Sequence, residues 1–557
     1  MISTAVVAAV VGFVPAVAQA ASPSATPSGA ATATAPAAGA GAGAAAETAV
    51  QAAAEQDLAA KGVGAAQQKA AAAAPAAAPS AAPKFTVGVG SYSTDSLSVG
   101  VATGVTTDLP NGDISYQLDW GDGSPVETDA ANASAYGHFK HTFRKAGTHT
   151  ITVTATDQTN KLTATTTAEV VLNGSEFTPY APTRLLDTRD GTGAPYVGAV
   201  GPNTATRVKV AGNGGIPAGV TAVALNITAT NAVADGHVIA YASGAKPPTT
   251  SNVNFAAGRT VPTLAIVPVG ADGYVELANR SGGTVDLIAD VTGYFAKAPA
   301  NGYTSVKPAR IADTREGRGT VQGQVAGQGT FDLQVAGQGG LPAQGVAAVA
   351  LNVTVTNPQG SGHLTVSPSG GQPSATSNLN FEPGQTVANA VIVPVGPDGK
   401  VTVRNGSWSG ADVIVDVTGY YSADGKAAYR PVDPWRVWDS RTLSLALKGQ
   451  DYYRQYAGAI VGRSAEALVL NATVTNTQGS GHLSVAPDPN TADSYGTTGR
   501  EVRPTPPDSS VLNWEKGATV SNLVQADVSG ADAVDFWNRG WESTDLIIDV
   551  FGVYDKI

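Results

Sequence analysis

The chain has 557 residues, too many for one ordinary domain, and several domains are therefore expected. It contains no cysteine, which excludes disulfides and thiolate metal sites. Its formal net charge of −11 argues against a protein that binds nucleic acid, because such proteins present positive charge to phosphates. The chain carries no zinc-protease motif, P-loop or dinucleotide fingerprint, and it predicts no cofactor and no metal.

Residues 1–20 have the features of a secretory signal peptide. An apolar run extends from Ala5 to Val14, and Ala18-Gln19-Ala20 is a small-x-small cleavage signal. The run is shorter than the about 20 apolar residues of a membrane-spanning helix. No basic residue precedes Lys61, and we interpret this as a sign that translation starts further upstream. We expect a secreted, extracellular protein, in one reading associated with the cell surface, with no membrane span after signal cleavage.

Residues 21–83 consist mainly of alanine with Ser, Thr, Pro and Gly. They have almost no large apolar side chains, so they cannot bury a core, and the composition predicts a disordered linker. A stretch from Glu47 to Ala74 could form a transient helix, because alanine is the best helix former.

An alternating pattern begins at Phe85. In "THTITVTATD" (148–157), apolar residues alternate with threonine, which predicts a half-buried β-strand. The sequence "DWGDGSP" (119–125) predicts a turn, because its glycines supply backbone freedom and its aspartates bond nearby amides. With "HTF" at 141–143, these motifs make residues 84–173 similar to the PKD (polycystic kidney disease) domain family. The resemblance implies an Ig-like β-sandwich, found mostly in extracellular spacer and adhesion modules.

Asp119, Asp122 and Asp129 lie in and after this turn. Carboxylates are the ligands that Ca²⁺ prefers, so a calcium site is one interpretation. The favoured interpretation is that these side chains stabilise turns.

The remainder is a threefold repeat. "RLLDTR", "RIADTR" and "RVWDSR" place an Asp at 187, 313 and 439, a spacing of 126 residues (313 − 187 and 439 − 313). Each copy continues with "ALN" or "VLN", then "SNVNF", "SNLNF" or "VLNW", and closes on "VTGYF", "VTGYY" or "VFGVY". Short alternating strands, split by Gly, Pro and Asn turns, predict a β-sandwich in each copy. We expect three such domains, at 175–298, 301–423 and 427–557, joined by short linkers into a semi-rigid rod.

The fold class is therefore all-β: one Ig-like domain and three copies of a second β-sandwich, after a disordered Ala-rich segment. The repeats resemble those of secreted actinobacterial proteins that open on "LDTR" and end on "VTGYF". The resemblance implies a secreted or cell-surface setting and carries no activity. The third copy departs from it, with Asp-Ser-Arg in place of Asp-Thr-Arg and an insertion at 488–510.

The Asp-Thr-Arg motif is interpreted as a structural clamp. In this hypothesis the Arg pairs with carboxylates that recur, four residues apart, in each closing strand, because two carboxylates on one strand face need a cation. Catalysis rarely needs one constellation in three copies, so a metal site and a catalytic site are the weaker interpretations. The residues of the predicted clamp are Asp187, Arg189, Asp286, Asp290, Asp313, Arg315, Asp412, Asp416, Asp439, Arg441, Asp545 and Asp549.

His237, His363 and His482 occupy one repeat position, which predicts a locally packed histidine and not a metal cluster. No Gly-x-Ser-x-Gly elbow accompanies them. An enzyme of the glycoside hydrolase class would need two carboxylates at a cleft. Neighbouring arginines are expected to lower the pKa of the closing-strand carboxyls and so to spoil an acid role. We therefore expect no catalytic residue.

Trp408 and Trp541 each follow a turn asparagine by three residues, where the first copy has Gly282. This spacing predicts two tryptophans at hairpin tips, a typical platform for a sugar ring or a partner protein. Trp435 is a supporting candidate, because the other copies have Thr183 and Ala309 there. The alternative is a Trp folded back over its own hairpin.

The sequence thus predicts a secreted, non-enzymatic surface or matrix protein, acting as a spacer and as a binding or adhesion rod. A glycan or a surface protein is the expected partner. The alternative is a carbohydrate- or cell-wall-binding protein, and a glycoside hydrolase is the weakest reading.

Overall fold

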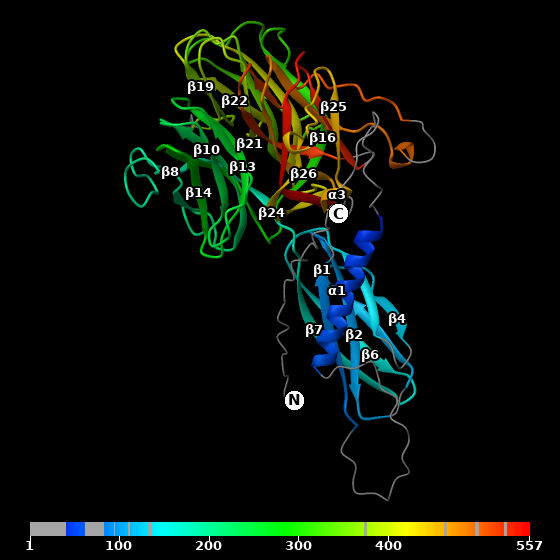
Figure 1. Ribbon diagram of the computed structural model, residues 1–557. Coiled ribbons are helices and arrows are strands. Elements are labelled where there is room, and N and C mark those ends of the chain that lie inside the picture. The colour runs from blue at the N-terminus through cyan, green and yellow to red at the C-terminus, as the bar shows by residue number, and fades with distance from the viewer. Residues whose placement is uncertain are drawn as a thin grey trace, which may run out of the picture. The chain divides into compact units, whose positions relative to one another are not determined.

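The computed structural model describes residues 40–61, 83–93, 95–109, 112–131, 136–371, 376–461, 465–495, 501–528 and 532–556 (Figure 1). The chain divides into two compact units, Met1–Asn173 (unit 1) and Gly174–Ile557 (unit 2). Strands make up 55% of the structure and helices 5%, which confirms the all-β prediction. None of the described helices has the length and hydrophobicity that a bilayer crossing needs. The predicted signal peptide lies outside the described residues.

Unit 1 is a sandwich of a three-stranded sheet, in the order β1-β2-β5, and a four-stranded sheet, in the order β4-β3-β6-β7. Trp120 is fully buried between them and stacks on His141 with 4.8 Å between ring centroids. Its indole Nε1 donates a hydrogen bond of 2.9 Å to Glu127. The strands are β1 (Phe85–Ser93), β2 (Ser98–Thr107), β3 (Ile114–Asp119), β4 (Glu127–Ala131), β5 (Gly137–Thr142), β6 (Thr148–Asp157) and β7 (Leu162–Val171).

The helix α1 (Ala40–Ala60) lies within the segment 21–83 that the composition predicts as a linker, and it overlaps the stretch Glu47–Ala74 for which a transient helix is predicted. It packs on β1 and β2, and Leu58 is buried although it is almost the only large apolar side chain of the helix. The contact is close because β1 has Gly90 there: a Cβ at Gly90 would lie 3.2 Å from the carbonyl oxygen of Ala54. Tertiary packing, not propensity alone, therefore orders this helix.

Unit 2 contains three sandwiches of one topology, each with an inner and an outer four-stranded antiparallel sheet. The inner sheet of the first copy has the order β13-β10-β15-β8. Those of the second and third copies, β21-β18-β23-β16 and β24-β31-β26-β29, are joined by pairing of β16 with β24 into one eight-stranded sheet. The outer sheets have the orders β12-β11-β14-β9, β17-β22-β19-β20 and β25-β30-β27-β28. The first copy comprises β8 (Glu176–Asp187), β9 (Ala205–Lys209), β10 (Val220–Thr230), β11 (Gly236–Ala242), β12 (Val253–Phe255), β13 (Val261–Pro268), β14 (Tyr274–Ser281) and β15 (Asp286–Ala296). The second comprises β16 (Gly302–Asp313), β17 (Thr330–Gln334), β18 (Val346–Thr356), β19 (Gly362–Pro368), β20 (Leu379–Phe381), β21 (Val387–Pro394), β22 (Lys400–Asn405) and β23 (Asp412–Ser422). The third comprises β24 (Ala427–Asp439), α2 (Ser440–Leu443), β25 (Tyr452–Tyr456), α3 (Gly458–Val461), β26 (Ala467–Thr475), β27 (Gly481–Pro487), η1 (Ala492–Tyr495), β28 (Leu512–Trp514), β29 (Val520–Asp527), β30 (Ala533–Asn538) and β31 (Asp545–Lys556).

The three sandwiches close around a shared core. Their inner sheets are buried on both faces: one face packs on the outer sheet, and the other contributes small and aromatic side chains to a common cluster. The rings of Phe295, Tyr421 and Tyr554, one from each copy, form a triangle with centroid distances of 6.3, 6.3 and 6.5 Å. Nearly equal distances between equivalent residues show that the copies are arranged with pseudo-threefold symmetry.

Polar bonds follow the same cyclic order. The side-chain amide of Asn226 donates to the carbonyl oxygen of Ser377 in the second copy, and that of Asn352 donates to Ser510 in the third. The amide of Asn471 closes the ring with a bond of 2.7 Å to Ser251 in the first copy. Each seam therefore uses the Asn of the "ALN" or "VLN" motif of β10, β18 or β26 against the segment that precedes β12, β20 or β28 in the next copy. The expectation of a rod is wrong for unit 2, because the copies form a closed ring.

The glycine of the closing motif is required by the packing of the three copies around their shared core. A Cβ at Gly293 would lie 2.0 Å from the ring of Phe177, and a Cβ at Gly419 would lie 2.2 Å from the hydroxyl of Tyr303. Gly552 faces Tyr429 in the same way, at 2.3 Å. No larger residue fits without moving an aromatic ring of the shared core.

Candidate functional site

Each sandwich has two distinct ends. We call the crown end the one where β8, β16 and β24 finish and β15, β23 and β31 begin, and the base end the opposite one, which holds the aromatic triangle. The equivalent strands β13, β21 and β29 contact one another in the middle of unit 2. Their contacts run from the bond of 3.2 Å that the backbone amide of Leu264 donates to Asn389 to Ile266 and Ile392 in the shared core. These strands therefore run beside the axis, and all three crown ends point the same way.

A half-buried arginine at the crown end joins two carboxylates in every copy. The Nε atoms of Arg184, Arg310 and Arg436 donate to Asp290, Asp416 and Asp549 at 3.0, 3.0 and 2.8 Å. The Nη1 atoms of the same arginines reach Asp187, Asp313 and Asp439 at 3.0, 3.4 and 3.2 Å. The first arginine of "RxxDTR" is thus the cation between the two strands.

The predicted clamp therefore needs a correction. Arg189 does not meet the closing-strand carboxylates; its Nη2 pairs with Asp187 at 2.7 Å, and Arg315 and Arg441 pair with Asp313 and Asp439 at the same distance. The clamp residue that the prediction missed, Arg184 and its equivalents, recurs three positions before each motif Asp. That recurrence was the available signal.

The hydroxyl of the motif binds the remaining carboxylate. The Oγ1 of Thr188 donates to Asp286 at 2.9 Å and accepts from the backbone amide of Leu287 at 3.0 Å. Thr314 binds Asp412 at 3.0 Å, and Ser440 binds Asp545 at 2.6 Å. The replacement of Thr by Ser in the third copy therefore keeps the bond.

The two sets of buried carboxyls differ in pKa. The hydrogen bond from Arg189 holds the pKa of Asp187 below its ordinary value, although burial opposes it. Burial raises the pKa of Asp290, Asp416 and Asp549, and it outweighs the adjacent arginines. The arginines do lower these three pKa values, but the expected net lowering is wrong, because burial has the larger effect.

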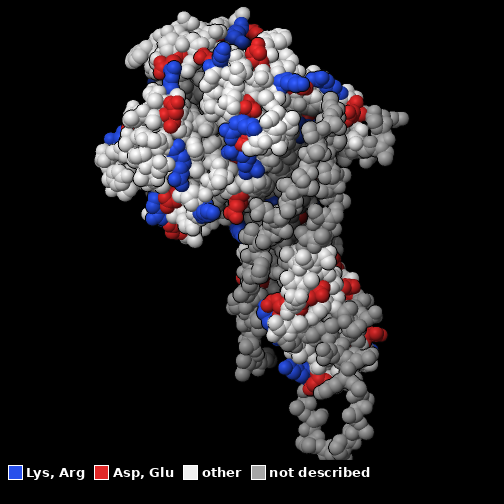
Figure 2. Space-filling view, in the orientation of Figure 1, with Lys and Arg blue, Asp and Glu red and all other residues white. Residues whose placement is uncertain are grey.

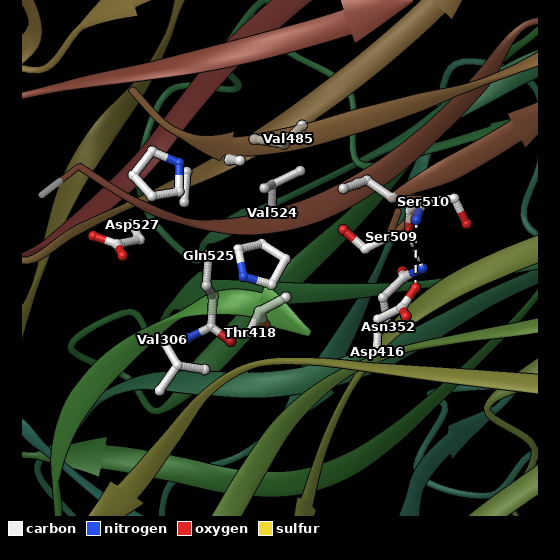
Figure 3. A pocket seen from close by; sticks show the side chains of 15 residues that line it. Val306, Asn352, Asp416, Thr418, Val485, Ser509, Ser510, Val524, Gln525 and Asp527 are labelled. Carbon is white, nitrogen blue, oxygen red and sulfur yellow. Dashed lines mark hydrogen bonds between the residues drawn. The ribbon is translucent and has the colours of Figure 1, made fainter. Parts of the chain in front are cut away.

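Asp416 also lines a cavity at the seam between the second and third copies (Figure 3). Figure 3 shows Asn352 and Asp416 at one end of the cavity, with the bond from Asn352 to Ser510. The cavity volume of about 20 Å³ admits a water molecule and excludes a sugar ring. Arg310 contributes to this seam as well, through a bond of 2.8 Å to the carbonyl oxygen of Asp508. The clamp therefore also joins neighbouring copies.

Trp408 and Trp541 stand at the crown end, in the loops β22–β23 and β30–β31. Each loop connects the outer sheet to the inner sheet, and its two strands do not pair, so the predicted hairpins are wrong although both tryptophans do stand at loop tips. They are 89% and 84% exposed. Neither folds back over its own loop, and the equivalent Gly282 has open space around it. The structure thus places both candidates where a partner can reach them.

Both tips rest on a fully buried asparagine. The Nδ2 of Asn405 donates to Val325 at 3.0 Å and to Ser409 at 2.8 Å, and its Oδ1 accepts from the amide of Ser407 at 3.0 Å. Asn538 makes the equivalent bonds to Leu447 and Glu542. The tip backbone is held by the same scaffold in each copy, and only the side chain at its apex differs.

Trp435 does not join these residues. It lies on β24 opposite Val550, half-buried against the core of the third copy. The structure therefore gives this candidate a packing role.

The insertion of the third copy covers part of its outer sheet. Asp488, at its start, and Asp535 on β30 both pair with Arg454 on β25. Burial and the nearby Asp488 raise the pKa of Asp535 to about 7, and its Oδ2 has no donor among the described residues. Tyr452 stacks on Trp537 beside them, at 4.4 Å. The described part of the insertion therefore buries a charged and aromatic face.

The three repeat histidines are half-buried at the start of β11, β19 and β27. Burial lowers the pKa of each, and that of His482, beside Arg539 and Arg310, to about 4. In unit 1, Asp119, Asp122 and Asp129 accept hydrogen bonds from backbone amides at 2.9, 3.0 and 3.0 Å. Throughout the described residues, no three His, Asp or Glu side chains gather as a metal site would require.

The comparisons with solved structures give weak similarities. A chain of the Sulfolobus turreted icosahedral virus is 10% identical, with 69% of this chain and 92% of that chain covered, at a TM-score of 0.14. A chain from an archaeal virus with a triple jelly-roll fold is 11% identical, with coverages of 69% and 91%, at 0.14. A SusE-like protein is 14% identical, with coverages of 35% and 93%, at 0.11. TM-scores this low carry no argument.

No curated protein matches the chain. A family model described as PKD domain matches residues 91–170, within unit 1. This segment has the two-sheet antiparallel sandwich and the buried Trp120 described above. Unit 1 therefore contains a PKD domain, an Ig-like module typical of extracellular proteins.

Proposed function

We propose that the chain is a secreted, non-enzymatic surface-binding protein that contacts its target through Trp408 and Trp541. The observation that carries this is the exposure of two tryptophans at equivalent tips, each on a backbone fixed by buried hydrogen bonds. A rigid aromatic side chain loses little conformational freedom on binding, which makes it an effective contact residue. The PKD domain supports an extracellular setting.

The non-enzymatic part of the proposal rests on access. A glycoside hydrolase would need two accessible carboxyls, and one of each closing-strand pair (Asp290, Asp416 or Asp549) is buried and bound to arginine. On the face of unit 2 seen in Figure 2, acidic and basic side chains are interspersed among neutral ones. Such a surface favours contact through apolar and aromatic groups.

Two target classes follow from the tips, a glycan that stacks on the indoles and a surface protein that buries them. Affinity electrophoresis and pull-down with cell-wall polysaccharides and surface protein extracts test both. We expect the double variant Trp408→Ala/Trp541→Ala to lose at least about 30-fold in affinity, since an exposed hot spot commonly contributes 2 kcal/mol or more. Gly282→Ala, at the equivalent tip of the first copy, is the matched control. Equal binding by the wild type and the double variant would refute the proposal.

A further inference from the structure

The exposed apolar side chains of unit 2 are concentrated at the crown end. Of the nine exposed large hydrophobic residues described in this unit, eight lie in crown loops, and the ninth, Val502, lies in the insertion. The crown loops are residues 188–200, 231–235, 256–260 and 282–284 in the first copy, 314–325, 357–361, 382–386 and 406–410 in the second, and 440–448, 476–480, 515–519 and 539–543 in the third. The eight residues are Tyr196, Val197, Val233, Val321, Trp408, Leu443, Leu445 and Trp541.

All three copies contribute to this crown, although they do so at different positions. The loop after the Asp-Thr-Arg motif exposes Tyr196 and Val197 in the first copy, Val321 in the second, and Leu443 and Leu445 in the third. Because the three crown ends point the same way, these loops lie at one end of unit 2. Glu176 and Lys556 lie at the base end, so the chain enters and leaves the repeat strands away from the crown.

The types of side chain exposed at the crown indicate which class of partner fits them best. Five of the eight side chains are aliphatic and cannot stack on a sugar ring, so a glycan leaves most of them exposed. They stand on separate loops of three sandwiches, and a rigid protein partner would have to match this spacing. A fluid lipid surface can accommodate separate side chains whatever the spacing between them. Aliphatic side chains would lie in the acyl region and Trp or Tyr at the level of the headgroups.

Charge is compatible with the same target. The crown loops contain eight Arg or Lys and six Asp or Glu, in a chain whose net charge is −11. The crown therefore lacks the acidic excess of the rest of the chain, and anionic headgroups would not be repelled there. We propose that the crown of unit 2 binds a lipid bilayer surface, with its apolar tips inserted at the headgroup boundary. This inference extends the proposed function, on which it rests for the accessibility of the two tryptophans.

Tryptophan fluorescence gives a direct test, because Trp120, Trp514 and Trp537 are buried and only the two tip tryptophans are largely exposed. The full chain is mixed with vesicles of phosphatidylcholine, alone or with phosphatidylglycerol. We expect the emission to shift to shorter wavelength and the protein to sediment with the vesicles. Brominated lipids should quench the wild type and leave Trp408→Ala/Trp541→Ala unquenched.

A second variant separates lipid insertion from aromatic stacking. Val321→Ser/Leu443→Ser/Leu445→Ser keeps both tryptophans, and we expect it to bind vesicles at least about tenfold more weakly. Val502→Ser, equally apolar and exposed but outside the crown, should bind as the wild type does. Thermal unfolding verifies that each variant is folded.

Several results would overturn the inference. These are vesicles that leave emission and sedimentation unchanged, equal losses in the Val502→Ser control, and crown-dependent self-association in analytical ultracentrifugation without lipid. If the chain does not bind vesicles but binds a polysaccharide or surface protein through Trp408 and Trp541, the lipid inference fails and the proposed function stands. If the triple serine variant loses vesicle binding while the tryptophans prove dispensable for every target, the lipid inference stands and the proposed function fails.

Discussion

The two ends of unit 2 use apolar side chains in opposite ways. At the base end, Phe295, Tyr421 and Tyr554 are buried against one another, and every copy supplies the same kind of residue. At the crown end, the equivalent tip positions hold Gly282, Trp408 and Trp541, and both tryptophans are exposed. Packing constrains the base, whereas the hydrogen bonds of the tip asparagine hold the crown backbone whatever side chain stands at the apex. The comparison teaches that positions with the same kind of residue in all three copies maintain the fold, whereas the positions that differ between copies form the surface available for contacts.

The largest predicted effect is the difference between two glycine substitutions. Gly419→Ala at the base end should destabilise unit 2 by more than about 3 kcal/mol, because its Cβ would lie 2.2 Å from the hydroxyl of Tyr303. Gly282→Ala at the crown end should leave the midpoint of thermal unfolding unchanged, since nothing lies within 4 Å. Similar midpoints for the two variants would contradict the distinction between the ends.

The next effect compares two arginines of one clamp. Arg310→Ala should cost about 3–5 kcal/mol, because it leaves Asp416 and Asp313 without their shared cation. Arg315→Ala should cost about 1 kcal/mol or less, because its side chain is 42% exposed while that of Arg310 is 14% exposed. Denaturant unfolding of both variants measures the difference. A larger loss for Arg315→Ala would restore the original assignment of the clamp.

A pH dependence should arise at the crown end. Burial lowers the pKa of His482 to about 4, below its ordinary value of 6.5, so the unfolded chain binds more protons between these values. Stability should therefore fall as the pH drops from 6.5 to 4, by about 1–3 kcal/mol from this residue. At the base end, burial raises the pKa of Tyr421 above its ordinary range, so this group stays neutral throughout. His482→Gln should flatten the acid limb of stability against pH, and an unchanged acid limb would rule out this histidine as its source.

The smallest predicted effect belongs to the tips. Trp408→Ala and Trp541→Ala should each change the free energy of unfolding by less than about 0.5 kcal/mol, because exposed substitutions remove little packing. Calorimetry of unit 2 in the full chain measures this. A substantial loss of stability would mean that the indoles pack on the protein, and the crown would then resemble the base.

Several features could be read from the sequence because they depend on local pattern. The alternation in "THTITVTATD" predicts β6, and the position of Trp408 and Trp541 after a turn asparagine predicts exposed tips. Only part of the clamp could be predicted from the sequence. Two arginines lie within six residues in "RLLDTR", and their order does not reveal which one faces Asp290. The geometry decides this, because Arg184 lies directly opposite Asp290 in the β8–β15 ladder and Arg189 lies beyond its end.

What the sequence by itself determined is the all-β class, the repeat and the PKD motif, since each is written in neighbouring residues. Only the tertiary structure decided that the copies close into a ring. Ala222 and Ala224 read as ordinary core residues, although they face the shared cluster and not the outer sheet. The linkers are compatible with a rod or a ring, because burial is a property of two surfaces that meet, and a single strand does not record which surface it meets. The same reason applies to α1, whose single buried leucine becomes informative only beside Gly90.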